Sequence, residues 1–332
     1  MVNPEMEKPL DTFNLAGEVS RGSDETDKLG ARLERYHNAK KRALENLNVL
    51  NIYQAGDDLS RERYRRGSAL LSGCGNYLQF RNYYTVGKSR LHKASFCKQH
   101  LICPLCAIRR GAKVLKSYLD RYKYLMLQNP TLRLSMITLT VKNGDDLNER
   151  FNHLQKSVKR VFERRRDFLK KGWGKTEWRK VHGYVGTYEV TNKGNGWHPH
   201  AHIMVLHSSS FDYAALKEEW FDITGDSHVL NVTAAMHPEE PERDFLEVFK
   251  YSVKFTDLTP ESNIHAWDVL RGRRLLFSGG SFRGVEVPED LTDTPLDDLP
   301  YIELLYRYTF AGYSLVSSVS EDPRDLLLTG NY

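Results

Sequence analysis

Residues 196–205 read GWHPHAHIMV and contain three histidines at alternate positions. Side chains alternate between the two faces of a β-strand, so His198, His200 and His202 share one face, and the alternate apolar residues that follow point into a core. Imidazoles two residues apart on one face lie roughly 6.6–7 Å from each other along the strand, and both can reach a divalent ion between them. Three histidines at this period beside an apolar run therefore predict a metal-binding strand.

A partner strand is expected directly before this one. The segment HGYVGTYEVT, residues 182–191, is rich in β-forming residues, and turn-forming residues separate it from the histidines. If residues 192–197 form a hairpin loop, three pairs lie opposite each other: Thr191 with His198, Glu189 with His200, and Thr187 with His202. Glu189 then adds a carboxylate to the histidine face, and such nitrogen and oxygen ligands suit Mg²⁺ or Mn²⁺ with positions left open for a phosphate oxygen. A cross-strand Glu–His ion pair on a hydrated surface is the alternative interpretation.

The rest of the chain alternates between helical and strand patterns. Apolar residues at helical spacing predict helices at 27–50, 107–127, 146–170, 212–223 and 241–257. Further β-rich segments predict strands at 132–141, 198–206 and 228–233, and no elements are assigned beyond residue 259. Interleaved helices and strands with a hairpin at the centre predict an α+β fold, in which helices pack on one face of an antiparallel sheet.

Positive charge is concentrated in two blocks. Residues 61–125 contain fifteen Lys and Arg against two acids, which gives a net charge of +13. Residues 156–181 carry a net charge of +8, whereas residues 284–325 carry −8. Segregation of this size predicts a polyanionic partner and not only a solvated face. The residues of the first block that we expect to contact DNA are Arg90, Lys93, Arg109, Arg110 and Lys113.

The four cysteines predict one zinc site. The spacing Cys97-x5-Cys103-x2-Cys106 supplies three thiolates, and a Cys-Pro-x-Cys knuckle lets two of them share one ion on a tight turn. In a reducing compartment such clustering favours metal over a disulfide. The fourth ligand is Cys74 or, alternatively, His100 or His92. Because the surroundings are basic, we expect a structural zinc that holds a DNA-contacting surface.

A predicted helix that follows the histidine strand carries candidate catalytic side chains. In the segment FLEVFKYSVK, residues 245–254, Glu247 and Tyr251 are four residues apart and Lys254 follows at i+3, so the three share one helical face. The phenol of a tyrosine, with its pKa near 10, becomes a useful nucleophile only when the attacked phosphate is activated, which a metal ion can do. Lys254 can favour the phenolate, and Glu247 is placed to act as a general base. Without the metal site, this would be an ordinary amphipathic helix.

Together these motifs resemble those of the HUH endonucleases, which are DNA-nicking enzymes. His200-Ala201-His202 is similar to the histidine strand of that superfamily, and Tyr251 followed by Lys254 is similar to the catalytic helix of its replication-type members. The sequence resembles most closely the rolling-circle replication initiators of small Gram-positive plasmids. These combine a motif like ITLTV (residues 137–141), then His-Pro-His-x-His, then Glu-x-x-x-Tyr and Lys. The resemblance includes the cysteine segment and covers roughly residues 70–285.

The resemblance implies an HUH nuclease core with a ferredoxin-like or RRM-like antiparallel sheet, preceded by an N-terminal basic, zinc-bearing helical region. We divide the chain accordingly into four regions: a flexible tail at 1–25, a basic helical and zinc-binding DNA-contact region at 26–130, the nuclease core at 131–285, and an acidic C-terminal region at 286–332.

The resemblance also implies a reaction. Tyr251 would become linked to the 5′ end of the nicked strand, the free 3′-OH would prime synthesis, and Glu247 would let water end the round without a second tyrosine. The implied partners are double-stranded plasmid origin DNA that is single-stranded at the nick, together with a host DNA polymerase. A host helicase is also expected, because the chain has no G-x-x-x-x-G-K-[ST] motif.

Three other functions are considered. A mobilisation relaxase usually has its tyrosine before the histidine strand, and a tyrosine transposase of this type is commonly smaller and lacks the cysteine module. A non-catalytic, zinc-containing DNA-binding regulator accounts for the basic blocks and the cysteines, but not for the histidines, Glu247 or Tyr251. The absence of a signal-like start and of a long apolar run predicts a cytoplasmic protein without a membrane segment.

Overall fold

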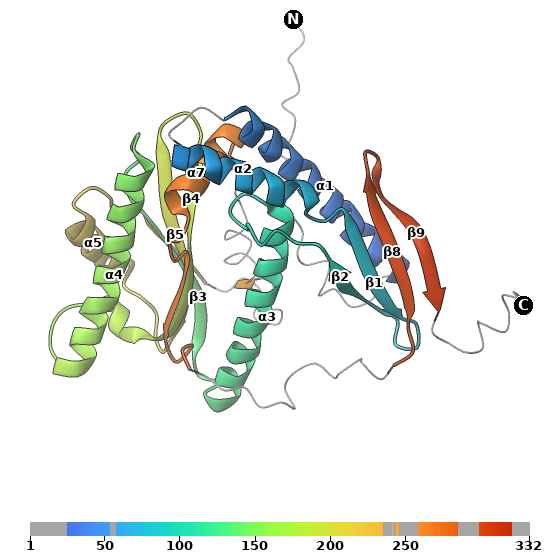
Figure 1. The fold of residues 1–332 in the computed structure, drawn as a ribbon. Coiled ribbons are helices and arrows are strands. Elements are labelled where there is room, and N and C mark those ends of the chain that lie inside the picture. The colour runs from blue at the N-terminus through green and yellow to red at the C-terminus, as the bar shows by residue number, and fades with distance from the viewer. Residues whose placement is uncertain are drawn as a thin grey trace, which may run out of the picture.

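Two antiparallel sheets with helices packed around them make up the fold (Figure 1). The structure is a computed structural model that describes residues 25–53, 58–234, 241, 244–245, 258–284 and 299–320. The α+β class and the antiparallel pairing predicted from the sequence are confirmed. In the described part of the chain, no helix combines the length and the apolarity that a membrane span requires.

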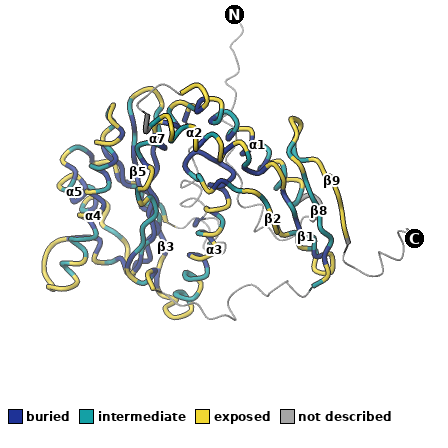
Figure 2. Tube along the Cα trace, viewed as in Figure 1, coloured by how far each residue is buried: buried dark blue, intermediate teal, exposed yellow. Residues whose placement is uncertain are grey.

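The larger sheet has five strands in the order β6-β3-β5-β4-β7. Their bounds are β3 (Arg133–Thr140), β4 (Val181–Asn192), β5 (Trp197–His207), β6 (Leu230–Ala234) and β7 (Leu276–Gly280). The histidine strand is β5, the central strand, and its two neighbours flank it along most of its length. Figure 2 shows that the middle of this sheet is the most deeply buried part of the molecule.

Helices cover both faces of this sheet, and not one face as the sequence pattern predicted. Helices α4 (Leu147–Lys171) and α5 (Tyr213–Thr224) lie on one side, and α3 (Pro104–Gln128) lies on the other (Figure 1). Phe151 and Phe162 of α4 make ring contacts with Tyr188 and Tyr184 of β4. On the opposite face, the Tyr118 hydroxyl of α3 lies 2.9 Å from the Ser278 hydroxyl of β7.

Local sequence signals explain the bounds of α4. The Asp146 side chain accepts a hydrogen bond from the Glu149 amide at 3.1 Å, which caps the start of the helix. Gly172 has φ +75 at the other end, a left-handed conformation that favours glycine. Between these caps, residues at helical spacing are buried against the sheet: Leu147, Phe151, Leu154, Val158 and Val161.

The smaller sheet joins the two ends of the described chain. Its order is β2-β1-β8-β9, with β1 (Tyr77–Tyr83), β2 (Lys88–Ala94), β8 (Ile302–Thr309) and β9 (Gly312–Ser320). A helical region was predicted where β1 and β2 form a hairpin, and no strand was predicted in the C-terminal segment. Because β1 pairs with β8, the C-terminal hairpin packs directly on the basic region.

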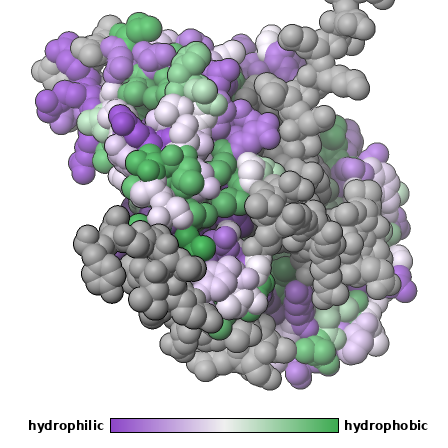
Figure 3. Space-filling model, turned by 90° about the vertical axis from the view of Figure 1, so that its right-hand side faces the viewer, coloured by the Kyte–Doolittle hydropathy of each residue, from purple (hydrophilic) through white to green (hydrophobic). Residues whose placement is uncertain are grey.

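The C-terminal hairpin is the most exposed part of the smaller sheet. Figure 3 views the molecule from the side that β8 and β9 occupy in Figure 1, and it shows hydrophobic side chains exposed among polar ones. Leu315, Val316 and Val319 of β9 are 52%, 56% and 58% exposed. The other face of this sheet packs on α1 (Glu25–Ile52), where the His37 ring stacks on Tyr308 with centroids 5.6 Å apart.

The remaining helices are α2 (Asp58–Gly73) and α7 (Pro260–Leu270). α1 packs against α2, α3 and α7 and so connects the two sheets. The sequence predicted neither α2 nor α7 as a separate helix. The helix expected at 241–257 falls almost entirely outside the described residues, as does most of the tail assigned to residues 1–25.

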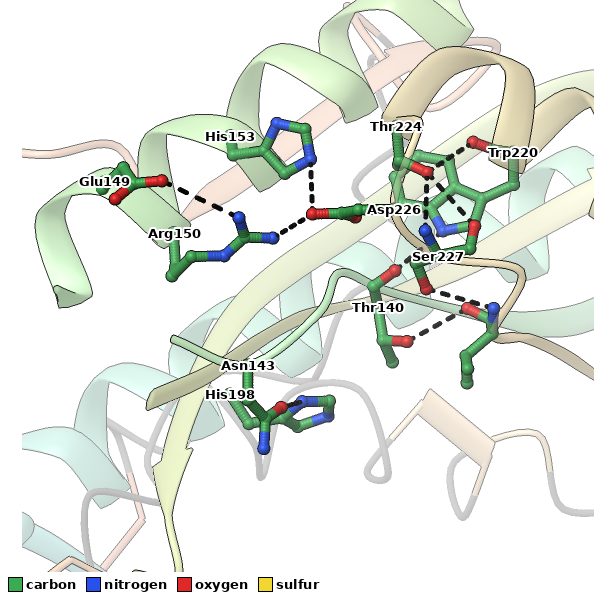
Figure 4. A network of polar contacts seen from close by, with 11 residues as sticks. Thr140, Asn143, Glu149, Arg150, His153, His198, Trp220, Thr224, Asp226 and Ser227 are labelled. Atoms are coloured by element: carbon green, nitrogen blue, oxygen red, sulfur yellow. Dashed lines mark hydrogen bonds and ion pairs between the residues drawn. The ribbon is translucent and has the colours of Figure 1, made fainter. Parts of the chain in front are cut away.

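A polar network joins α4, α5 and the end of β3 (Figure 4). Asp226, just after α5, accepts a hydrogen bond from Arg150 at 2.5 Å and lies 3.3 Å from the His153 Nε2 atom. The guanidinium of Arg150 outweighs the effect of burial, so the pKa of Asp226 is below its ordinary value. Nearby, the buried Trp220 indole donates a hydrogen bond at 2.8 Å to the Thr140 carbonyl. The Trp220 contact ties the end of β3 to α5, and the Asp226 contacts tie the segment after α5 to α4.

The Trp220 contact generates a stability prediction. Trp220→Phe keeps an aromatic ring but leaves the Thr140 carbonyl without this donor, and we expect the free energy of unfolding to fall by about 1–3 kcal/mol. Urea titration followed by circular dichroism measures the change. Trp173→Phe is the matched control, because Trp173 is 71% exposed and should tolerate the change. Equal stability of the two variants would contradict the assigned role of the indole.

Candidate metal centres

Glu189, His200 and His202 form a compact group of potential metal ligands on the larger sheet. One carboxylate oxygen, Oε2 of Glu189, lies 3.2 Å from Nε2 of His200 and 3.4 Å from Nε2 of His202. One ligand atom from each residue lies within 4.8 Å of the others, and all three residues are buried. The group is therefore convergent, as a metal site requires.

The strand pairing puts these three side chains together. Glu189 of β4 is the cross-strand partner of His200, and Thr187 is the partner of His202, so the register predicted from the sequence is confirmed. On the other side of β5, His202 is the cross-strand partner of Thr138 of β3, and His200 is the partner of Thr140. The Thr138 hydroxyl lies 3.0 Å from Nδ1 of His202 and fixes the orientation of that ring.

The protonation of His200 is a test of whether a cation fits this group. Its Nδ1 atom lies 3.2 Å from the His198 carbonyl, which can only accept, so Nδ1 carries a proton. In the neutral ring, Nε2 then presents a lone pair toward the Glu189 carboxylate. Two acceptors repel each other at 3.2 Å unless the ring is protonated or a cation lies between them. The donor set thus fits a bound divalent ion.

The electrostatics of Glu189 agree with a cationic environment. Burial alone raises the pKa of this carboxyl, but hydrogen bonds and charge from His200 and His202 outweigh burial, and the pKa lies below its ordinary value. Glu189 is therefore an ionised carboxylate at neutral pH, which is the form that binds metal.

His198 lies beside this group but not in it. Its Nδ1 atom lies 2.6 Å from the Asn143 Oδ1 atom (Figure 4), and its ring stacks on that of His200 with centroids 5.2 Å apart. Burial, followed by the charge of His200, lowers the pKa of His198, so its neutral form dominates. The predicted set of three histidines thus divides into two that converge on Glu189 and one that contacts Asn143.

Two polar neighbours of the site were not identified from the sequence. Thr138 lies in the ITLTV motif on which the family resemblance rests, but neither Thr138 nor Asn143 was predicted to contact a histidine. The segment after β3 is tied to the hairpin by paired backbone hydrogen bonds between Gly144 and Trp197, at 3.2 and 2.7 Å. No local pattern marks Asn143 or Thr138 as a neighbour of the histidines, because the contacts come from the pairing of segments more than fifty residues apart.

The four cysteines form a second, separate cluster. The sulfur of Cys74 lies 3.5 Å from that of Cys103 and 3.6 Å from that of Cys106, and Cys97 lies 3.5 Å from Cys106. Cys103 and Cys106 begin helix α3, whereas Cys74 follows α2 and Cys97 follows β2. The convergence of four buried sulfurs from three segments has the donor set of a tetrahedral zinc site.

The cluster contains Cys74 and neither of the histidines considered as alternatives. The hydrogen bonds from the neighbouring cysteines hold the pKa of Cys74 below its ordinary value, whereas the pKa of Cys103 is raised. A bound metal ion would stabilise the cysteines as thiolates, because the thiolate is the form that binds metal.

A buried lysine faces this cluster. Lys40 of α1 is 1% exposed, and its ammonium donates hydrogen bonds at 2.6 Å to the Cys74 carbonyl and at 2.9 Å to the Asn76 side chain. Burial lowers the pKa of Lys40, and the nearby thiols of Cys74, Cys103 and Cys97 oppose that effect. Lys40 therefore ties α1 to the loop that carries the first cysteine.

The residues expected to contact DNA are all exposed, but they lie on two elements. Arg90 and Lys93 belong to the hairpin strand β2, and Arg109, Arg110 and Lys113 belong to the first turns of α3. The Arg109 guanidinium lies 3.9 Å from the centre of the Phe96 ring. The three catalytic candidates on the tyrosine helix, Glu247, Tyr251 and Lys254, lie outside the described residues.

Comparison with known proteins places the chain among replication proteins. Residues 88–303, more than half of the chain, match the Rep_1 family, described as Replication protein. A protein from Streptococcus pneumoniae serotype 2 (strain D39 / NCTC 7466), named Protein rep, is 28% identical over 247 residues, which are 69% of this chain and 73% of that protein.

Two further relatives carry the same name. The one from Staphylococcus aureus is 26% identical over 57% of this chain and 82% of its own length, and the one from Bacillus sp is 26% identical over 71% and 85%. No solved structure gives a significant match. The matched segment contains both the histidine strand and three of the four clustered cysteines, and the chain belongs to the Rep_1 family of replication proteins.

Proposed function

We propose that this chain is a plasmid rolling-circle replication initiator that nicks its origin with Tyr251 and transfers the strand. The observation that carries the proposal is the convergence of the Glu189 carboxylate with the Nε2 atoms of His200 and His202. A replication protein that only bound DNA would not need a buried, ionised carboxylate held against two imidazoles. The order of the sequence motifs supplies the nucleophile, because Tyr251 follows the histidine strand as it does in the initiators that the chain resembles.

The nick is a transesterification. The phenolate oxygen of Tyr251 attacks the scissile phosphorus and forms a phosphotyrosine bond to the 5′ end, while the bond from phosphorus to the 3′-oxygen breaks. The 3′-oxygen takes up a proton and leaves as the 3′-OH that primes synthesis. A Mg²⁺ or Mn²⁺ ion held by Glu189, His200 and His202 would polarise the phosphate and stabilise the charge that develops on it.

The remaining polar groups have distinct roles in this proposal. Lys254 favours the phenolate form of Tyr251. Glu247 accepts a proton from the water or hydroxyl that resolves the phosphotyrosine link, so a round ends without a second tyrosine. His198 contacts Asn143 and packs on His200, and it therefore orients a metal ligand.

The cysteine cluster and the basic surface serve DNA binding in this proposal. Zn²⁺ held by Cys74, Cys97, Cys103 and Cys106 fixes the start of α3, where exposed cations are available to contact the phosphates of the double-stranded origin. The nuclease core at 131–285 contains the larger sheet. A host helicase and DNA polymerase, acting in the cytoplasm, would extend the primer.

The metal site predicts a loss of nicking without a loss of DNA binding. His200→Ala, His202→Ala and Glu189→Gln should each reduce Mn²⁺-dependent nicking of a supercoiled origin plasmid by about a hundredfold or more, because charge stabilisation by a metal is worth several kcal/mol. His182→Ala is the matched control, since His182 lies on the same sheet and is exposed. If the triad variants nick as well as this control, the metal assignment is wrong.

The cysteine cluster predicts bound zinc. The purified protein should contain about one zinc per chain that resists mild chelation. Cys103→Ser should lose that zinc and weaken DNA binding or folding, as measured by elemental analysis and thermal melting. His92→Ala, which alters an exposed histidine outside the cluster, should keep the metal. Folded, DNA-binding protein that contains no zinc would reject this site.

The tyrosine helix predicts a division of labour in time. Tyr251→Phe should abolish both nicking and the covalent protein–DNA adduct, whereas Tyr84→Phe, a partly exposed control, should change neither. Glu247→Ala should still form the adduct but resolve it on the order of 10²–10⁴ times more slowly, so that adduct and over-long products accumulate. Denaturing gels with end-labelled DNA measure both steps. If Glu247→Ala prevents the first nick, the carboxylate acts before resolution and its assigned role is wrong.

A further inference from the structure

An open cavity of about 330 Å³ lies where the cysteine loop meets the turn between α7 and β7. Four of its wall residues carry positively charged or titratable nitrogen groups, and we call it the arginine cavity: His100, Arg110, Arg273 and Arg274. Among the residues that the structure describes, no carboxylate lines it. A concave site with cations from two separate segments and no acid has the chemistry of a phosphate-binding site.

The turn that forms one wall is rigid. Gly272 has φ +76, and this left-handed conformation lets the chain reverse directly after α7. Three contacts hold the Arg273 side chain in place. Its guanidinium donates hydrogen bonds to the Val269 carbonyl at 2.9 Å and to the Asn152 side chain at 2.6 Å. It also lies over the Phe151 ring. Arg273 therefore braces the turn against α4 and adds positive potential to the cavity.

The other two arginines are exposed at the cavity. Arg274 uses Nε to donate to the Leu276 carbonyl at 3.1 Å, which leaves the outer edge of its guanidinium for a ligand. Arg110 comes from the first turns of α3 and lies near His100. Within the described residues, neither Arg110 nor Arg274 makes an ion pair with a carboxylate.

His100 links the cavity to the cysteine cluster. It lies in the loop between Cys97 and Cys103. In that loop the Gln99 carbonyl accepts a hydrogen bond from the Cys103 amide at 2.8 Å. Burial, and secondarily the charge of Arg110, lowers the pKa of His100, so the ring is a neutral hydrogen-bonding group at the cavity. The cysteine segment thus forms one wall of the cavity, and the turn that leads into β7 of the larger sheet forms the other.

Two lining residues of the arginine cavity belong to the segment that pairs with β4, the strand that carries Glu189. Leu275 and Leu276 line the cavity, and they pair directly with β4, where the Tyr188 amide donates to the Leu275 carbonyl at 2.9 Å and Thr187 is the partner of Leu276. Glu189 is two residues further along β4. A strand spacing of about 4.8 Å and a rise of about 3.3 Å per residue put the backbones of Leu276 and Glu189 on the order of 8 Å apart.

We propose that the arginine cavity binds a backbone phosphate of the DNA strand next to the scissile phosphate, with Arg110 and Arg274 as the two cations that contact it. This proposal rests on the proposed nicking function, because it names how the same strand is held at the metal centre. In this proposal the cysteine cluster also positions Arg110 and His100 beside the larger sheet.

The test is the salt dependence of binding to a fluorescein-labelled oligothymidylate, measured by anisotropy without added divalent ion. A sequence-independent probe is suitable because phosphate contacts do not select bases. R110Q/R274Q should weaken binding on the order of tenfold near physiological salt and lower the slope of log K against log salt by about 0.7, which is the contribution of one neutralised single-strand phosphate. R110K/R274K should restore the slope. Arg133→Gln, at an exposed arginine of β3 outside both basic blocks, should leave binding unchanged.

The outcomes separate this proposal from the proposed function. Normal melting of R110Q/R274Q together with an unchanged slope would overturn the phosphate site, even if the wild-type protein nicks its origin. Wild-type protein that shows the expected slopes but never nicks would overturn the proposed function and leave the phosphate site supported. A loss of binding that Arg→Lys does not restore, in a protein with normal melting, would also overturn the site, because lysine neutralises a phosphate as a point charge.

Discussion

The antiparallel pairing of β4 with β5 is the constraint on which the rest of the structure depends. Glu189 lies opposite His200 in this register, and a slip of one residue would turn every side chain of β5 to the other face. Packing prevents such a slip, because the face that carries Ala201, Ile203 and Val205 is completely buried. Aromatic contacts between α4 and β4, together with the core beneath α4, thus determine which face the histidines occupy.

The cysteine cluster is the second organising centre, and it connects the two sheets. The four sulfurs come from segments that follow α2, follow β2 and begin α3, so one bound ion would hold the smaller sheet, the basic surface and the helix behind the larger sheet in a fixed arrangement. Lys40 contributes a buried cation beside these thiols. Since α3 also contacts β7, the orientation of this module determines what faces the edge of the larger sheet. The arginine cavity lies at that junction.

Much of the larger sheet could be predicted from the sequence, because its signals are local. Period-two histidines, the turn-forming residues that precede them and the helical spacing of apolar residues in 146–170 each encode structure within a few residues, and β5, β4 and α4 follow from them. Glu189 could be placed because a hairpin register follows from its loop length. The smaller sheet could not be predicted in the same way. β1 pairs with β8, more than two hundred residues away, and nothing in either segment identifies the other. For the same reason, only the folded chain shows the contacts of Asn143 and Thr138 with the histidines, and only the folded chain shows the arginine cavity.

Anomalous diffraction from a crystal soaked in Mn²⁺ would determine whether β4 and β5 build a divalent-metal centre. We expect one manganese peak at about 2.0–2.3 Å from a Glu189 oxygen and from the Nε2 atoms of His200 and His202. The four cysteines should surround a separate peak at the zinc absorption edge. Manganese bound elsewhere, or none at this triad while Glu189 remains in contact with both imidazoles, would contradict the account and reduce the triad to a buried ion pair.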